Sequence, residues 1–200
     1  MPIKMERQYR TVAMPMMIQQ DNKRFDSDFY VEGYAATWER YPLYEDEEGI
    51  VYEQFLPEAF KDTDFSDVIF QYNHDGRVFA RTSNQTLLVE PDSRGLFQAA
   101  DLRLTEASRS MYQDIETGLI TKMSWAFLPD REMMEYDRNT RTIIHHRIPK
   151  VFDVSAVSYP ANSGTEINAR SFCDGVIAGR LKEFQEREER IKKIKLMIEV

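Results

Sequence analysis

The chain has 200 residues and a formal net charge of −8, with 42% hydrophobic and 12% aromatic residues. This length and composition predict one globular domain with room for a helical appendage, rather than a disordered chain. The acidic balance argues against nucleic-acid binding, which needs a basic surface to displace counterions from phosphates.

No apolar run approaches 18 residues, and the amino terminus lacks a charged-then-apolar signal pattern. We therefore expect a soluble, cytoplasmic protein that does not enter a membrane. The single cysteine, Cys173, excludes an intrachain disulfide and fits a reducing compartment.

Alternating apolar and polar residues dominate the first 160 positions and predict short β-strands separated by turns. The acidic segment 44–49 predicts an exposed loop, and residues 55–60 predict a single helical turn with both phenylalanines directed inward. The predicted strands of the first half cover residues 9–18, 29–37, 68–72, 78–82, 87–90 and 95–104.

One helix interrupts this pattern. Thr105 can cap it, Gly118 can end it, and Ala107, Met111 and Ile115 fall on one face at spacings of four.

Further strands follow this helix, and together they suggest the fold class. A strand at 122–127, a hairpin over 131–137 and 140–148, and a strand from 151 are predicted. Many short strands at intervals of about ten residues suggest a small antiparallel β-barrel. We therefore expect an α+β, mainly β fold: a closed or nearly closed antiparallel β-barrel flanked by helices, with a C-terminal helix.

The pattern changes near Pro160, where a predicted loop (160–165) precedes a predicted helix (174–197). The helix carries apolar residues seven positions apart, with Glu188 interrupting the stripe: Ile177, Phe184, Ile191 and Ile198. We favour a terminal helix that packs through residues 177–184 with the rest exposed. The alternative is a docking segment for a partner helix.

The predicted organisation is a β-barrel domain over residues 1–162, a linker over 163–175 and the C-terminal helix over 176–200.

Three residues that could act together stand in strand-like segments beside turn or helix signals: His74, Ser124 and Asp153. A serine hydroxyl is a poor nucleophile unless a base takes its proton, and a carboxylate can orient that base. The three residue types are the minimum for acyl transfer to water. Their spacing in the sequence does not show that they meet.

Each of the three also has a structural explanation. Ser124, beside Trp125, could simply fill a tight space, and His74 lies among turn formers where an exposed strand end is expected. Asp153 lies in an apolar strand and needs a partner, because an unpaired buried carboxylate is costly. Arg147 is the structural alternative to His74 for that role.

Five short motifs favour the catalytic explanation of these three residues over the structural ones. In chain order they are Gly33-Tyr-Ala-Ala36, Phe55-Leu-Pro-Glu-Ala-Phe60, Gln71-Tyr-Asn-His-Asp75, Gly118-Leu-Ile-Thr-Lys-Met-Ser-Trp-Ala-Phe127 and Phe152-Asp-Val-Ser-Ala-Val-Ser-Tyr-Pro-Ala-Asn162. This series resembles the prohead (capsid maturation) protease family of tailed bacteriophages and prophages, which is similar in fold to herpesvirus assemblin. The resemblance covers residues 30–162.

The resemblance implies a serine endopeptidase with His74 as general base, Ser124 as nucleophile and Asp153 as the third member. Many relatives carry Glu in place of Asp153, and a Ser-Ile-Gly-Tyr-like run in place of Ser124-Trp-Ala-Phe127. The shorter acid should reach the imidazole only if the backbone lies slightly closer.

The resemblance also implies partners and a location. The expected substrates are the scaffolding segment of the major capsid protein and the chain itself, cleaved inside the procapsid in the bacterial host cytoplasm. A homodimer is a further candidate assembly, and the C-terminal helix is a docking or self-processed segment. No cofactor and no metal are expected.

Alternatives remain for individual residues. His145 or His146 could replace Asp153, since assemblin pairs its base with a second histidine, but their alternating stretch favours solvent exposure. Three histidines without an HExxH motif or paired cysteines argue against a zinc site. Cys173 has no histidine nearby in the sequence, and Asp174 would raise its pKa, so a structural role is favoured over a catalytic one.

The rival function is a non-catalytic β-barrel that serves as an internal scaffold or assembly chaperone through its C-terminal helix. Such a protein would keep the fold motifs without needing Ser124 and His74 in register.

Overall fold

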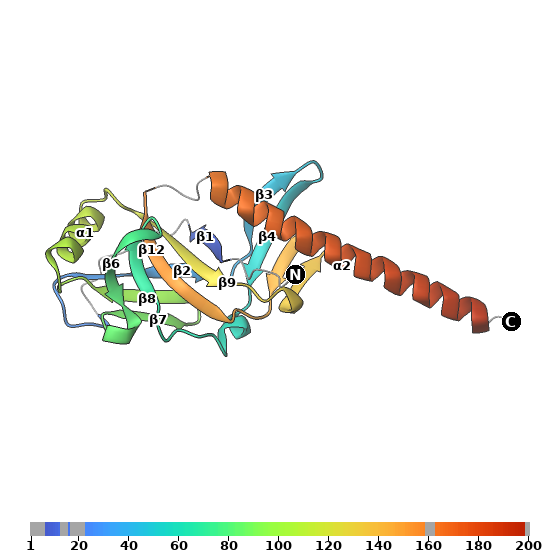
Figure 1. Cartoon of the computed structure of the whole chain (residues 1–200), viewed down its shortest axis with the longest axis horizontal. Coiled ribbons are helices and arrows are strands. Elements are labelled where there is room, and N and C mark those ends of the chain that lie inside the picture. Colours follow the sequence, from blue (N-terminus) through green and yellow to red (C-terminus); the bar gives the residue numbers. More distant parts are fainter. Residues whose placement is uncertain (1–6, 13–15, 17–22, 159–162, 199–200) are drawn as a thin grey trace.

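The computed structural model describes residues 7–12, 16, 23–158 and 163–198 (Figure 1). Within these ranges the protein is mainly β, with two α-helices and three short 3-10 turns. The helices are α1 (Glu106–Glu116) and α2 (Ser163–Ile198), and the 3-10 turns cover Pro57–Phe60, Thr82–Asn84 and Arg131–Met133. The strands are β1 (Gln8–Val12), β2 (Tyr30–Thr37), β3 (Tyr41–Asp46), β4 (Gly49–Phe55), β5 (Ile69–Tyr72), β6 (Asp75–Arg81), β7 (Leu87–Pro91), β8 (Gly95–Asp101), β9 (Lys122–Leu128), β10 (Met134–Asp137), β11 (Thr142–His145) and β12 (Lys150–Val157).

In the described part of the chain, the strands form three open sheets. Their orders are β1-β9-β12-β5-β6, β2-β8-β7 and β10-β11-β4-β3. Two pairs are parallel, β12 with β5 and β11 with β4, and the other pairs are antiparallel. The mainly β prediction and the C-terminal helix are confirmed, but the predicted antiparallel barrel is wrong. Period-two alternation indicates only that a strand has one buried face, and packed open sheets satisfy it as well as a barrel does.

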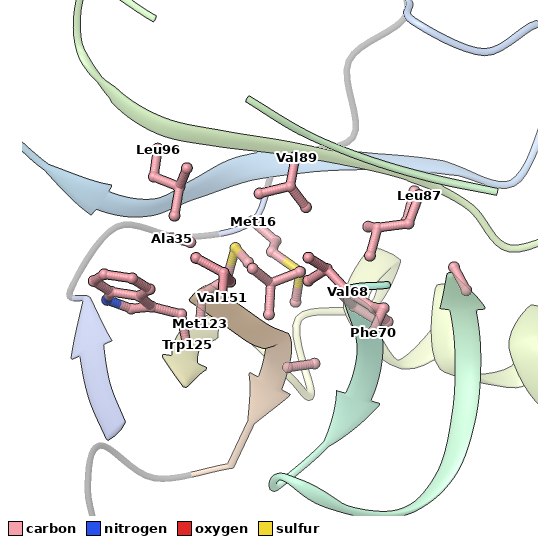
Figure 2. Close-up of a cluster of buried hydrophobic side chains, with 14 of the residues drawn as sticks. Met16, Ala35, Val68, Phe70, Leu87, Val89, Leu96, Met123, Trp125 and Val151 are labelled. Atoms are coloured by element: carbon pink, nitrogen blue, oxygen red, sulfur yellow. The ribbon is translucent and has the colours of Figure 1, made fainter. Parts of the chain in front are cut away.

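The main core fills the space between the five-stranded and three-stranded sheets, as Figure 2 shows. Met123 and Trp125 of β9 point from one layer, and Val89 and Leu96 point from the other. Gly95 allows the three-stranded sheet to form, because a Cβ built there would lie 2.1 Å from the Ala36 carbonyl oxygen of β2. One face of β9, the strand that carries Ser124, is therefore packed in the core between the two sheets.

A second apolar cluster joins the four-stranded sheet to the start of α2. Phe172, Cys173 and Val176 of α2 pack against Val51 and Met134 of β4 and β10. The helix is longer than predicted: it begins at Ser163 and runs through residues 163–175, which were expected to be a linker. Its buried contacts also come earlier than predicted, since Phe184 is 42% exposed. The division into domains stays a prediction.

Several local predictions are confirmed and others are corrected. Helix α1 begins after Thr105, whose side chain accepts a hydrogen bond from the Ser108 N–H, and Gly118 follows its end with φ +74°. The acidic segment 44–49, predicted to be a loop, instead belongs to the hairpin of β3 and β4, which were both missed. The first predicted strand, 9–18, is observed as β1, and most of its remainder lies outside the described residues.

Candidate active site

Ser124 and Asp153 lie on adjacent antiparallel strands, β9 and β12. Ser124 is directly opposite Ser155, two residues along the strand from Asp153. Because residues two apart in a strand point to the same face, Asp153 and Ser155 share the face on which Ser124 lies. Both Ser124 and Asp153 are buried.

His74 reaches this face from the tight turn between β5 and β6. Tyr72 pairs with Asp75, so Asn73 and His74 are the two central residues of the turn, with φ of 51° and 59°. This left-handed backbone is typical of two-residue hairpin turns and is uncommon for histidine. Strand β5 runs parallel to β12 and places the turn beside the strand of Asp153.

Asn73 fixes the turn to β12 at two points. Its N–H donates to the carbonyl oxygen of Ala156 at 2.9 Å, and its side-chain oxygen accepts from the Ser158 N–H at 3.1 Å. The position of His74 is therefore tied to the strand that carries Asp153.

The three predicted residues meet. Nε2 of His74 lies 2.7 Å from Oγ of Ser124, and Nδ1 of His74 lies 2.5 Å from Oδ1 of Asp153. With Nδ1–H directed at the carboxylate, Nε2 is free to accept the serine proton. This is the geometry that general-base activation of a serine hydroxyl requires.

Asp153 has two further donors that the sequence did not indicate. Ser155 Oγ donates to Oδ1 at 2.7 Å, and the guanidinium of Arg7 pairs with Oδ2. Arg147, the partner considered from sequence, instead pairs with Asp130 at 2.9 Å. The buried carboxylate is thus held by three groups, and His74 is one of them.

Strand β1 supports the nucleophile from its other side. It pairs with β9, and the Ser124 hydroxyl lies 2.9 Å from the Arg10 carbonyl oxygen. The ring of Tyr9 meets the His74 ring edge-on, with centroids 4.7 Å apart. A serine hydroxyl has one proton, so the Arg10 carbonyl and His74 Nε2 are alternative acceptors for it.

A buried ion cluster anchors β1. The Arg10 guanidinium donates to Glu53 of β4 at 2.5 and 2.8 Å, and Tyr41 also donates to this carboxylate. His145 Nε2 lies 2.8 Å from Oε1 of Glu53, the same oxygen that accepts from the Arg10 Nη2. Burial alone would raise the pKa of Glu53, but the charge of Arg10 and the hydrogen bonds from His145 and Arg10 lower it below its usual range.

The other two histidines lie away from the site. His145 is fully buried against Glu53, contrary to the solvent exposure predicted for it, while His146 is partly exposed and pairs with Glu135. Within the described residues, these two histidines bond to Glu53 and Glu135, whereas Asp153 is the carboxylate at Nδ1 of His74.

Cys173 lies in the apolar cluster beneath α2. Burial raises the pKa of its thiol to about 12, against the opposing charge of Arg10. The thiol is therefore protonated near neutral pH, which favours the structural role expected from sequence. Among the residues that the structure describes, no group of three His, Cys, Asp or Glu side chains could hold a metal ion. No helix in the described ranges is long and apolar enough to cross a membrane.

An imidazole oriented against a serine hydroxyl is the arrangement found in hydrolases that use serine as the nucleophile. A family model described as Caudovirus prohead serine protease matches residues 16–175. The chain belongs to this family, as the motif resemblance predicted, and is a phage capsid maturation protease in the general sense. Comparisons with curated proteins and with solved structures gave no match.

Sequence reasoning missed the supporting residues Arg7, Tyr9, Arg10 and Asn73. Asn73 is a turn former, and its effect on His74 follows only once β5 is known to lie beside β12. Arg10 lies in β1 and Arg7 lies just before it, more than a hundred residues away from Ser124 and Asp153, and no local pattern marks such contacts.

Proposed function

We propose that the protein is a serine endopeptidase of the Ser-His-Asp type. Ser124 attacks a peptide carbonyl, and His74 accepts the serine proton and returns it to the departing amine. Asp153 holds the imidazole in the required tautomer, and water then releases the acyl-enzyme.

One observation carries this proposal: His74 stands between Ser124 and Asp153, with its two ring nitrogens 2.7 and 2.5 Å from their oxygens. A scaffold protein of the same fold has no need for that alignment. The burial of Asp153 and its three donors also fit a rigid support for the imidazole.

The proposed substrates are the scaffolding segment of the major capsid protein and the chain itself. The family membership supports capsid proteins as the substrate class, and it supports action inside the procapsid in the host cytoplasm. An enzyme that digests a scaffold must stay inactive until it is packaged, so we further propose that high local concentration inside the shell activates it.

The test incubates the purified full chain with its cognate capsid protein and follows products by intact mass. Wild type should cut, and Ser124→Ala should not. Ser93→Ala, which changes an exposed serine between β7 and β8, is the matched control and should cut like wild type. Cleavage by Ser124→Ala would move the nucleophile elsewhere. Binding without cleavage by every variant would favour the scaffold function.

The nucleophile can also be tested without a known substrate. An organophosphorus fluoride forms a covalent ester with an activated serine and releases fluoride. Wild type should gain one adduct, located on Ser124 by peptide mass mapping, and Ser124→Ala should gain none. Labelling of Ser93 at the same rate would contradict selective activation of Ser124.

A further inference from the structure

The C-terminal part of α2 projects away from the sheets (Figure 1). Every side chain from Lys182 to Lys195 is exposed. A helical segment of this length is marginal in water by itself, because most helix stability in proteins comes from packing of one face. Phe184 contacts the body, because the Arg138 guanidinium lies over its ring at 4.8 Å from the centroid. Beyond that contact, no side chain of residues 185–195 is buried against the described part of the chain.

Apolar side chains gather on one face of this segment. Phe184, Ile191 and Ile194 are 42%, 44% and 50% exposed, and Leu181 is half-buried at the edge of the body. Their spacings of three and seven residues place them on one helical stripe, which Glu188 interrupts. The stripe is narrow, as in a two-helix interface.

The charges of the same segment are divided into two halves. Residues 183–189 hold four glutamates and one arginine, for a net charge of −3. Residues 190–195 hold one arginine and three lysines and no acid, for a net charge of +4. Within the described part of the helix, Arg180 pairs with Glu183 and Lys182 pairs with Glu186, and neither ion pair uses a residue of the basic half.

We propose that residues 184–195 pair with the same segment of a second copy of this chain, antiparallel, around a two-fold axis between residues 189 and 190. This orientation sets the acidic half of each helix against the basic half of the other. It also brings Phe184 of each copy close to Ile194 of the other, so the apolar stripes meet. A parallel pair would place like charges together along both halves, which is unfavourable.

The body of the protein offers a matching surface beside this stripe. A groove between α2 and β10 is lined by Met133, Phe184 and Arg187, among others, and Met133 is 46% exposed. In the antiparallel arrangement, the C-terminal end of the second copy's helix extends toward this groove. The interface is isologous, so both copies use it equally.

This pairing would explain why activity depends on concentration. Only that link to activity rests on the proposed function; the pairing itself does not. Pairing is measured by mass and activity by Ser124 labelling, so the two can fail separately. A helix of capsid protein is the competing occupant of the same stripe.

The test first measures the molar mass of the full chain by sedimentation over a wide concentration range, where wild type should shift from monomer to dimer. Two charge-reversed variants should each associate at least about tenfold more weakly, because like charges then face each other. The basic-half variant carries Arg190→Glu, Lys192→Glu, Lys193→Glu and Lys195→Glu, and the acidic-half variant carries Glu183→Lys, Glu186→Lys, Glu188→Lys and Glu189→Lys. An equimolar mixture of the two should recover the dimer.

Orientation is tested under oxidation with one exposed cysteine introduced at a time, the native Cys173 being buried. Copies of residue 188 are about 5 Å apart along the axis in the antiparallel pair, whereas copies of residue 195 are about 16 Å apart. Glu188→Cys should therefore cross-link and Lys195→Cys should not. Helix content and the free energy of unfolding in urea check that each variant is folded.

Three outcomes would overturn the proposal: a wild type that is monomeric at every concentration, a dimer that ignores both charge reversals, or efficient cross-linking through Lys195→Cys. The first outcome, combined with binding of capsid protein by the stripe, would assign the segment to that partner instead.

Discussion

The hydroxyl oxygen of Ser124 lies 2.9 Å from the carbonyl oxygen of Arg10, whose guanidinium is buried against Glu53 in a different sheet. Arg10 therefore connects the nucleophile to a buried ion cluster centred on Glu53. Strand β1 is held in place by this cluster as well as by its pairing with β9. A strand fixed by a buried ion pair is an integral part of the fold, because its departure would leave Glu53 uncompensated.

We predict that Glu53→Gln destabilises the protein by about 3–5 kcal/mol, because it leaves the buried Arg10 charge without its partner. The free energy of unfolding in urea measures this. Ser124 labelling should also slow in the folded fraction, since the Arg10 carbonyl is released from its position. Glu58→Gln, at an exposed glutamate, is the control and should change neither quantity. Unchanged stability in Glu53→Gln would show that the ion pair contributes nothing.

The same carboxylate predicts an acid-side pH dependence. The pKa of Glu53 is lower in the folded protein than in the unfolded chain. Its contribution to stability is therefore complete above the ordinary glutamate pKa and is lost as pH falls below it. The stability difference between wild type and Glu53→Gln should shrink progressively below about pH 4.5. A difference that is constant from pH 7 to pH 3 would contradict the lowered pKa.

The sequence predicts which three side chains meet better than it predicts the architecture. His74, Ser124 and Asp153 stand out in the sequence because short motifs surround them, and the structure brings them into hydrogen-bonding distance. The barrel prediction fails because strand spacing and alternation do not specify which strand pairs with which. The parallel pairing of β5 with β12, which brings His74 to Asp153, joins residues far apart in the chain and has no local signature.

The hairpin of β3 and β4 shows a second limit. Its acidic residues predict solvent exposure, which is correct for much of the segment, but exposure does not exclude a strand at the edge of a sheet. Glu53 illustrates the same point in reverse. A glutamate in an alternating strand is expected at the surface. Its burial is tolerable because Arg10, from a distant strand, balances its charge, and Tyr41 and His145 add hydrogen bonds.

Asp153→Asn should lower the rate of Ser124 labelling by about four orders of magnitude, because an amide no longer fixes the tautomer of His74 that accepts the serine proton. The labelling rate is measured by intact mass at a fixed probe concentration. Asp28→Asn, at an exposed aspartate, should label like wild type. If Asp153→Asn labels at the wild-type rate while folded, Asp153 does not orient the imidazole.

Asn73 should act as a positioning residue for His74. Asn73→Gly keeps the left-handed turn but loses the acceptor for the Ser158 N–H, whereas Asn73→Ala also meets the left-handed penalty of roughly 1–2 kcal/mol. Labelling of Ser124 should fall modestly in Asn73→Gly and further in Asn73→Ala. Asn73→Asp keeps both the acceptor and the tolerance of this backbone, so it should restore most of the rate. Equal rates in all three folded variants would leave Asn73 with a structural role only.

Cys173 should make the protein less stable at alkaline pH. Burial raises the pKa of its thiol to about 12 in the folded protein, while the unfolded chain releases the proton near the ordinary value of 9.0. The stabilisation that comes from the protonated thiol is therefore complete below about pH 9 and is lost as pH rises from there toward 12. Cys173→Ala should be less stable than wild type at pH 7, because it leaves a small cavity among Phe172, Val176 and their neighbours. Comparing the unfolding free energies of the two proteins in urea from pH 7 to pH 10.5 removes the shared contribution of the buried tyrosines. The wild type should lose more stability than the variant over that range.

A thiol reagent at pH 8 should modify the native wild type only at the rate of unfolding. Rapid modification without unfolding would show that the thiol is accessible and that the cluster beneath α2 opens readily.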